Sequence, residues 1–525
     1  MPHDEHHSRG QFHPRCCSTG GESGPAADGV TRRGFLGGVS AFALGSTALS
    51  GLSWPALAMS DDELSEAPRR RPLAVKPLLV YSTPQRRPQT SWRSWGGIQT
   101  EADAKQEVAR IDAELDALKQ AADFPVKFLP IARVKSAADV AGISDLAAAD
   151  MVLIYAAGGW MDIFDAIGKH GKDVVFFVRH KSGPVYLWYE IISPRYLRQH
   201  TDELKVRHAD FTDVVVDSQE ELLWRLRSLC GLHNALSSRI LAVGGPGGWS
   251  QPAGVVPKLA EQRWKLDIRT VSYDELGRLI KEARADEAAV KRARRRADEY
   301  LKLAGTTLET ERAFVDNAFV LEQIFRGLLK QADCGAITIN ECMGTIIPLA
   351  ETTACLPLSL LNDAGFLAFC ESDFVVIPSG ILLAGIAGKP VFLQDPTYPH
   401  DGLITLAHCT APRKMDGKNL EPARILTHFE SDYGAAPKVE MHKGQQVTMI
   451  APDFEAKRWL GLLGTIEDHP FMDICRSQID VRFECDSGLI AERTPGFHWM
   501  LAYGDYRREL GYALRRVGIA WECLT

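Results

Sequence analysis

The chain has 525 residues, a length that suits two or three domains rather than one. Its hydrophobic content of 45% and charged content of 24% are ordinary for a soluble globular protein with a sizeable core. The net charge of −7 argues against a general nucleic-acid-binding surface, so no nucleic-acid partner is expected.

The first 58 residues are predicted to be an export signal rather than part of the fold. Thr31–Leu36 contains two consecutive arginines followed by Phe and Leu, and residues 37–52 form a mildly apolar stretch. Ala56–Ala58 has the small-x-small pattern of a cleavage site. These features in this order predict a twin-arginine signal, export of the folded protein to a periplasmic or extracytoplasmic location, and no stable membrane span after cleavage. An uncleaved signal that acts as an anchor is the alternative.

Three folded units are predicted after a charged linker over residues 59–77. Residues 78–237 alternate strand and helix segments, a pattern typical of a parallel α/β unit. A second α/β unit is expected over residues 238–335, with one long helix over Tyr273–Tyr300. Residues 336–525 should form a third domain that becomes richer in short strands after Asp395. The predicted fold class is α/β, with two Rossmann-like parallel units and a mixed C-terminal domain. The strands expected in the first unit are Leu78–Tyr81, Val126–Leu129, Asp150–Ala156, Val174–Val178 and Val214–Val216.

Two conspicuous sequence features have plain structural interpretations. The basic run Lys291–Arg296 is expected to be the solvated face of a helix rather than a patch for an anionic partner. Nine cysteines follow the signal without a C-x-x-C spacing, so most are expected to be small buried side chains and not a disulfide framework.

Acidic residues follow three successive predicted strands in the last third of the chain. Ligands of an open parallel sheet bind at the carboxyl ends of its strands, so these acids are expected to share one edge. Carboxylates suit divalent cations and polyols, and Mn²⁺ also accepts imidazole ligands. Taken singly, each residue suits an ordinary structural role, and only the group predicts a site. The candidates are Glu341, Glu351, Glu371, Asp373 and Asp395, together with His408, His428 and His498.

Residues 343–428 resemble the catalytic region of the L-fucose and L-arabinose isomerase superfamily. The resemblance implies three domains, two α/β units followed by a third that holds much of the metal site, in the same order as the units predicted above. It covers the last third of the chain, and before that it is only topological. The segments that carry it are Pro357–Gly365, Phe369–Asp373, Gly388–Phe392, Leu406–Pro412 and Thr427–Ser431, and the closing segment Phe497–Tyr506 also fits.

The resemblance implies a Mn²⁺ ion held by a Glu, an Asp and a His. The Asp corresponds to Asp373, which follows a strand in a Glu-x-Asp sequence, and the His corresponds to His498. The Glu corresponds to Glu351, at the start of a predicted helix, with Glu341 at the end of the preceding strand as the alternative. The sequence does not decide between these two.

The implied activity is aldose–ketose isomerisation of a small sugar through an enediolate, with Glu351 and Asp373 as the catalytic carboxylates. His408 and His428 are candidates for contacts to sugar hydroxyls. The family builds its pocket partly from a neighbouring subunit, so a homo-oligomer is expected. Trp92, Trp95 and Trp160 could stack on a sugar, although core or interface packing is the favoured interpretation.

Two other classes of function stay open at this stage. An exported protein could keep the isomerase fold as a non-catalytic carbohydrate-binding protein. A nucleotide-dependent oxidoreductase is the third class, because Val243–Gly248 places a glycine cluster after a predicted strand. That cluster does not match G-x-G-x-x-G, which weakens the third class.

Overall fold

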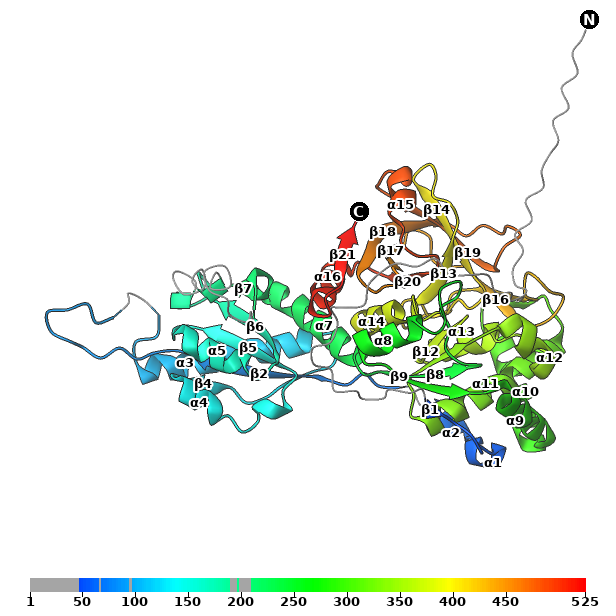
Figure 1. Cartoon of the computed structure of the whole chain (residues 1–525), viewed down its shortest axis with the longest axis horizontal. Coiled ribbons are helices and arrows are strands. Elements are labelled where there is room, and N and C mark those ends of the chain that lie inside the picture. Colours follow the sequence, from blue (N-terminus) through cyan, green and yellow to red (C-terminus); the bar gives the residue numbers. More distant parts are fainter. Residues whose placement is uncertain (1–46, 66–67, 94–96, 189–195, 198–208) are drawn as a thin grey trace, which may run out of the picture. The chain divides into compact units, whose positions relative to one another are not determined.

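The computed structural model describes residues 47–65, 68–93, 97–188, 196–197 and 209–525 (Figure 1). The arginine pair and most of the apolar stretch of the predicted signal lie outside these residues. The described chain contains parallel sheets, helices and a closed antiparallel sheet, which confirms the α/β class. Among these residues, no single helix is long and apolar enough to cross a membrane. The bent pair Cys342–Ala350 and Cys355–Asp363 meets the length and composition only when taken together.

The first sheet is entirely parallel and has the order β3-β2-β5-β6-β7, with β4 also paired to β2. Its strands β2, β5 and β6 are buried along nearly their whole length, as expected for strands covered on both faces, and they are apolar apart from Lys76 in β2 and Asp173 at the start of β6. The five strands predicted from the sequence all lie in this sheet. Its strands are β2 (Leu73–Val80), β3 (Val126–Phe128), β4 (Ala132–Val134), β5 (Met151–Ala156), β6 (Asp173–Val178) and β7 (Val214–Val216).

The helices of this region are α3 (Glu101–Ala121), α4 (Ala137–Ala141), α5 (Met161–Gly168) and α7 (Gln219–Ala235). Helix α3 begins at Thr100, whose hydroxyl accepts the Asp103 N–H while the Asp103 carboxylate accepts the Thr100 N–H, a reciprocal cap that fixes the helix start. Helix α7 crosses α14 (Ile377–Ala387) where Gly231 lies against Gly385 and Ile386. A Cβ at Gly231 would lie 2.3 Å from the Ile386 side chain, so this crossing requires glycine.

The second sheet is also parallel and has the order β1-β9-β8-β11-β12. It extends across the boundary expected at residue 335, because β11 and β12 complete the sheet that β8 and β9 begin. The strands are β1 (Thr47–Ala48), β8 (Arg239–Val243), β9 (Asp267–Val271), β11 (Ala336–Ile339) and β12 (Leu367–Phe369). The helices around it are α8 (Val256–Trp264), α9 (Tyr273–Ala285), α10 (Glu287–Leu301), α11 (Arg312–Ala332), α12 (Ile347–Ala350) and α13 (Cys355–Asp363).

The single helix predicted over Tyr273–Tyr300 is two helices, α9 and α10. The break falls at Asp286, whose carboxylate accepts the N–H groups of Ala288 and Ala289 and so caps the start of α10. An aspartate inside a helical pattern was the available signal for this break.

A third sheet closes on itself. Its strands run in the order β17-β20-β13-β14-β19-β18, and β18 pairs back onto β17, while β21 adds to β18 in parallel. All pairings within the ring are antiparallel. The strands are β13 (Phe392–Pro396), β14 (Leu403–His408), β17 (Gln446–Pro452), β18 (Arg458–Asp468), β19 (Ser477–Phe483), β20 (Trp499–Tyr503) and β21 (Ala520–Cys523). Helices α15 (Ser487–Arg493) and α16 (Arg507–Arg516) belong to the same region, and a small sheet joins β10 (Thr306–Leu308), β15 (Ala423–Leu426) and β16 (Ala436–Val439).

Strand β13 therefore does not continue the parallel sheet. The three successive predicted strands had suggested that it would. It pairs with β14 and β20, which lie later in the chain. An apolar run predicts a buried strand but carries no information about its partner, so the sequence could not distinguish these two arrangements.

Residues near the predicted cleavage site are packed into the fold. Strand β1 pairs with the edge strand β9, and the short helix α1 (Trp54–Leu57) contacts α9 and α11. Trp54 is buried and its indole N–H donates to Asp286 at 2.8 Å, while Leu57 is buried against Gly327. Helix α2 (Asp61–Ser65) follows, and its Glu63 pairs with Lys330. Cleavage after Ala58 would remove β1 and α1 from this surface.

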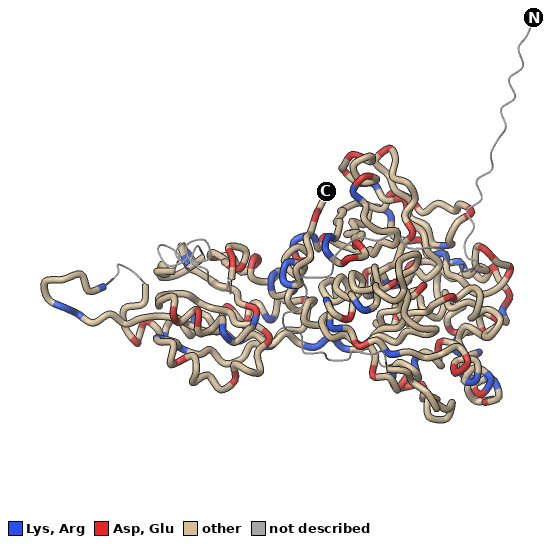
Figure 2. The backbone as a smooth tube through the Cα atoms, viewed as in Figure 1, with Lys and Arg blue, Asp and Glu red and all other residues tan. Residues whose placement is uncertain are grey.

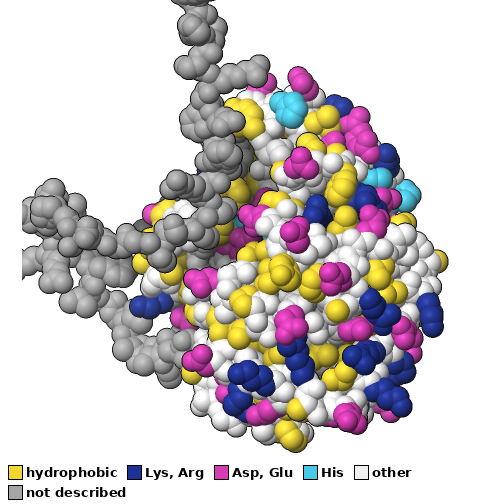
Figure 3. Space-filling view, turned by 90° about the vertical axis from the view of Figure 1, so that its right-hand side faces the viewer, with side chains coloured by type: hydrophobic (Ala, Val, Ile, Leu, Met, Phe, Trp, Pro, Cys, Tyr) yellow, Lys and Arg dark blue, Asp and Glu magenta, His cyan; other side chains and the backbone are white. Residues whose placement is uncertain are grey.

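Charged residues of both signs are spread along the chain (Figure 2). On the face shown in Figure 3, basic and acidic side chains are interspersed rather than sorted into one patch. The basic run on α10 follows this pattern, since Arg295 pairs with Asp61 and Glu299. Arg296 differs, because it pairs at 2.5 Å with the fully buried Glu322 on α11.

Candidate functional site

Five ionisable side chains from two sheets converge at one place. Two belong to the segment after β12, at the carboxyl edge of the second parallel sheet, and three belong to the closed sheet. Strand β13 pairs with both β14 and β20, so the register brings its acidic residue beside the histidines of those neighbours. The residues are Glu371 and Asp373 after β12, Asp395 on β13, His408 at the end of β14 and His498 directly before β20.

His498 lies at the centre of this cluster. Its Nδ1 is 2.6 Å from Oδ2 of Asp373, and its Nε2 is 3.2 Å from both Oε2 of Glu371 and Oδ1 of Asp395. On the other side of the cluster, Nε2 of His408 is 3.6 Å from Oε1 of Glu371. Two carboxylates and two imidazoles thus point their free ligand atoms at a common volume.

Asp373 orients His498 rather than facing that volume. One of its oxygens accepts the Val375 N–H at 2.9 Å, and the other bonds His498, so both are occupied. Histidine ligands of metals commonly hold their second ring nitrogen against a carboxylate in this way, which fixes the ring and its tautomer. The hydroxyl of Thr410 is similarly placed 3.1 Å from Nδ1 of His408.

Several buried polar atoms of the cluster form no well-aligned hydrogen bond within the described residues, although each lies 3.2–3.6 Å from an oppositely charged group of the cluster. They are Nε2 of His498, Nε2 of His408 and Oδ1 of Asp395. Buried polar atoms are rarely left without a well-aligned hydrogen bond, and a bound ion is one of the ordinary reasons. The donor set of carboxylates and imidazoles fits a transition cation such as Mn²⁺. The side chains of Cys370, Glu371 and His408 also lie within 4.8 Å of one another at their ligand atoms.

The cluster is electrostatically polarised. Burial raises the pKa of Glu371, but the hydrogen bonds and charges of His408 and His498 more than offset it, so the pKa lies well below its ordinary value. Burial lowers the pKa of His498, but Asp373, Asp395 and Glu371 together raise it well above the ordinary value. Burial raises the pKa of the Cys370 thiol well above its ordinary value, so the thiol is protonated at neutral pH and is a weaker ligand than the carboxylates.

The backbone at Glu371 and Ser372 is strained. Both residues have a left-handed conformation, with φ of 65° and 46°, which side chains other than glycine seldom adopt. The strain is held by Thr338, whose hydroxyl accepts the Ser372 N–H, and by Gly247, whose N–H donates to the Ser372 carbonyl at 3.0 Å. Such strain concentrates at functional sites, where the surrounding structure enforces an otherwise unfavourable geometry.

The glycine cluster after β8 thus packs against the acidic segment instead of forming a dinucleotide loop. Gly247 forms a bridge with Asp373, and the next helix begins only at Val256. The oxidoreductase alternative required this cluster to open a helix.

Glu351 does not join the residues with which it was expected to act. Its side chain is 68% exposed and its carboxylate pairs with Arg284 of α9 at 2.8 Å. The expectation of a Glu351–Asp373–His498 ligand set therefore needs correction, because the structure gathers Glu371 and Asp395 around His498 instead. Glu341 is exposed at the end of β11, at the same edge as Glu371, and forms no hydrogen bond or ion pair with His498.

His428 also has other surroundings. Its ring packs against Phe429, and its Nδ1 accepts the Glu430 N–H at 3.3 Å. It belongs to a neighbouring buried group of three cysteines, which sequence analysis treated as scattered core residues. Burial raises the pKa of Cys409, but hydrogen bonds from Cys355, Cys475 and His428 lower it well below the ordinary value. Cys475 links this group to the site, since its Sγ is 3.8 Å from Oδ2 of Asp395.

An exposed aromatic pair borders the site. Trp249 and Phe497 stack at 4.2 Å between ring centroids, and each ring meets His498 edge-on at 5.3 Å and 5.0 Å. Both are 45% exposed, which is unusual for stacked large aromatics. The sequence signal for Trp249 was its position directly after the glycine cluster.

The tryptophans singled out in the sequence lie elsewhere. Trp92 carries the Arg93 guanidinium over its ring, and Trp160 is exposed at the start of α5. Trp95 lies outside the described residues.

Comparisons with known proteins leave the family open. No protein-family model matches the chain, and no curated protein matches it. Among solved structures, a carbohydrate transporter from Acidothermus cellulolyticus 11B, crystallised in complex with myo-inositol, is similar at 12% sequence identity. The match covers 61% of this chain and 89% of that chain with a TM-score of 0.16.

Proposed function

We propose that this chain is a metal-dependent aldose–ketose isomerase-like protein that acts on a small sugar through an enediolate. The observation that carries the proposal is the convergence of Glu371 and Asp395 on His498, each with a carboxylate oxygen 3.2 Å from Nε2 of that histidine. Mn²⁺ suits a shell of two carboxylates and one imidazole.

Glu371, Asp395 and Nε2 of His498 would hold the cation, with His408 beside them. When bound, the cation would polarise the carbonyl oxygen of an open-chain sugar. Asp373 keeps the His498 ring in place and leaves Nε2 free to face the ligand. This role for Asp373 differs from direct coordination, and Glu351 has no role in the proposal.

The same two acids are the candidates for proton transfer between C1 and C2. The side chains of Glu371 and Asp395 are 35% and 26% exposed, so both acids lie at the edge of the cluster, although Oδ1 of Asp395 is itself buried. A carboxylate oxygen there would remove the C2 proton of an aldose as a general base and return it to C1 as a general acid, while the O2 hydroxyl proton passes to O1 and leaves the carbonyl of the ketose at C2. Trp249 and Phe497 offer a flat apolar surface for the sugar beside this position.

The experiment measures Mn²⁺ binding and turnover on the same preparations. Metal-free protein is titrated with Mn²⁺ in a calorimeter, and a panel of aldoses is scored for ketose formation. Glu371→Gln should lose Mn²⁺ binding and turnover, whereas the matched variant Glu351→Gln should retain both. Mn²⁺ binding together with sugar binding but no ketose would favour the carbohydrate-binding alternative. Absence of Mn²⁺ binding in the unaltered protein would contradict the proposal.

A further inference from the structure

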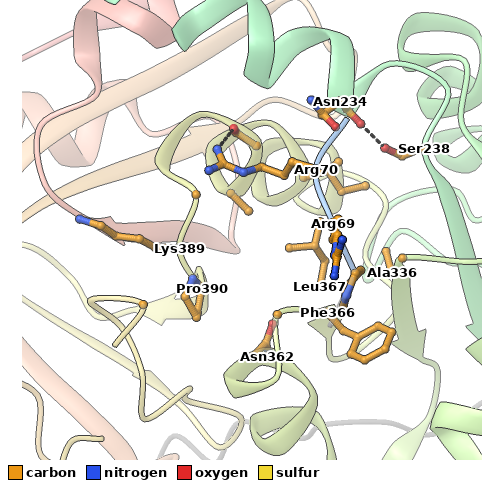
Figure 4. Close-up of a pocket in the computed structure, with 18 of the residues that line it drawn as sticks. Arg69, Arg70, Asn234, Ser238, Ala336, Asn362, Phe366, Leu367, Lys389 and Pro390 are labelled. Carbon is orange, nitrogen blue, oxygen red and sulfur yellow. Dashed lines mark hydrogen bonds between the residues drawn. The ribbon is translucent and has the colours of Figure 1, made fainter. Parts of the chain in front are cut away.

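A cavity of about 350 Å³ lies at the opposite edge of the second parallel sheet (Figure 4). Its walls come from the amino ends of β8, β11 and β12, from the end of α14 and from the segment just before β2. The candidate metal site is at the carboxyl edge of the same sheet, and β11 alone spans about 13 Å between the two edges. The cavity volume is in the range typical of small-molecule sites.

The charged side chains that line the cavity are almost all basic. Five of its residues are cationic, and Asp363 is its single acidic residue. The Asp363 carboxylate accepts the backbone N–H groups of Arg413 and Lys414, both at 2.8 Å, so it is held by the protein. The cationic residues are Arg69, Arg70, Arg239, Lys389 and Lys414.

Most of these cations have no carboxylate partner within the described chain. Arg239 pairs with Asp333 and is the exception. Arg70 donates to the carbonyls of Gly385 and Asp123, which leave its charge uncompensated. Among described residues, Lys389 and Lys414 form no side-chain hydrogen bond or ion pair although both are half-buried; Asp416 acts on Lys389, and Asp363 on Lys414, only at longer range. Partly buried lysines normally have a partner.

The position of Arg70 depends on a glycine. Gly388 has φ of 65°, and a Cβ built there would lie 2.4 Å from the Arg70 guanidinium. Any side chain at this position would displace Arg70 from the cavity. The adjacent Arg71 has a carboxylate partner, Asp150, so not every cation of this basic segment lacks one.

The remaining walls are preformed and partly apolar. Asn362 bonds both the N–H and the carbonyl of Ala368, and Ser238 donates to the Asn234 carbonyl, so these polar groups are satisfied without a ligand. Figure 4 shows Phe366, Leu367 and Pro390 around the same space as the arginines and Lys389. The side chains of the cavity that lack partners are therefore cationic, and they lie beside an apolar surface.

We propose that this cavity binds a phosphate group, carried by a small molecule or present as free inorganic phosphate, through Arg70, Lys389 and Lys414. Phosphate matches several convergent cationic donors, and the Arg70 guanidinium can donate two parallel N–H groups to two of its oxygens. This inference does not depend on the proposed function, because it uses none of the residues of the candidate metal site.

The test is calorimetric titration of the full chain in EDTA-containing buffer with glucose 6-phosphate, inorganic phosphate and glucose. We expect glucose 6-phosphate or inorganic phosphate, or both, to bind, with affinity that falls as salt is added. Tighter binding of glucose 6-phosphate would identify a phosphate ester as the source, and equal binding would identify free phosphate. Glucose alone should not bind at this cavity.

The double variant Lys389→Gln/Lys414→Gln should weaken phosphate binding at least tenfold. Lys418→Gln, which changes an exposed lysine just outside the cavity, should leave the affinity unchanged, and thermal unfolding should show that both variants are folded. Glu371→Gln should also bind phosphate normally, which separates this site from the metal site. No phosphate binding by the unaltered protein, or equal binding by the double variant, would overturn the inference.

Discussion

Replacing Asp373 with Asn tests how the site holds its central histidine. The substitution keeps the shape of the side chain and its acceptor for the Val375 N–H, but it removes the negative charge that bonds His498 at 2.6 Å. Loss of such an orienting partner typically weakens metal binding 10- to 100-fold, or about 1.4–2.7 kcal/mol. We therefore expect Asp373→Asn to bind Mn²⁺ weakly, with the fold intact.

The assay is calorimetric titration of metal-free protein with Mn²⁺ over a range of pH. Asp373, Asp395 and Glu371 raise the pKa of His498 against its burial, so in metal-free protein a proton competes with the cation and affinity should fall as the pH is lowered. Asp373→Asn removes one cause of the raised pKa, so its affinity should fall over a lower pH range. Unchanged affinity in this variant, or an equal loss in the control Glu351→Gln, would refute the positioning role.

Three further predictions follow from other parts of the structure. Hydrogen bonds and charges from two arginines lower the pKa of buried Glu322 to about 2 against its desolvation. The stability that this gives, about 3 kcal/mol, should be present above pH 4.5 and be lost as the pH falls to 2, and urea unfolding should show that Glu322→Gln lacks it already at pH 7. An unchanged acid unfolding transition in this variant would contradict the prediction. Trp249→Ala should weaken sugar binding about tenfold by removing the stacked surface on Phe497, with little change in melting temperature, as measured by calorimetry; equal sugar affinity would exclude the aromatic pair from the site. A chain that begins after residue 58 should be less stable by roughly 3–6 kcal/mol than one that begins at residue 47, because it lacks buried Trp54 and Leu57; identical denaturant curves would show that this segment does not pack.

The sequence predicted which segments form strands better than it predicted which strands pair with one another. Continuous apolar runs identified β5 and β6 directly, because both faces of those strands are buried. The same kind of run at Phe392–Pro396 gave a strand but not its sheet, since pairing with β14 and β20 depends on residues far along the chain. The Tyr273–Tyr300 pattern likewise concealed the cap at Asp286.

The sequence predicted the kinds of residue in the candidate site, but only some of the particular residues. Strand-end acids and a late histidine were identified, and His498 and Asp373 do lie together. Choosing Glu351 failed because its neighbour Arg284 lies on another helix, 67 positions away in the sequence. Glu371 and Asp395 could be chosen only once the closed sheet had placed Asp395 beside the histidine, a contact that no local pattern contains.

The most direct test of the proposed site is anomalous diffraction from crystals soaked in Mn²⁺. The expected result is one strong peak bounded by Oε2 of Glu371, Oδ1 of Asp395 and Nε2 of His498, with Asp373 behind the histidine ring. A peak at Glu351 or Glu341, or no peak in this cluster at saturating Mn²⁺, would contradict it.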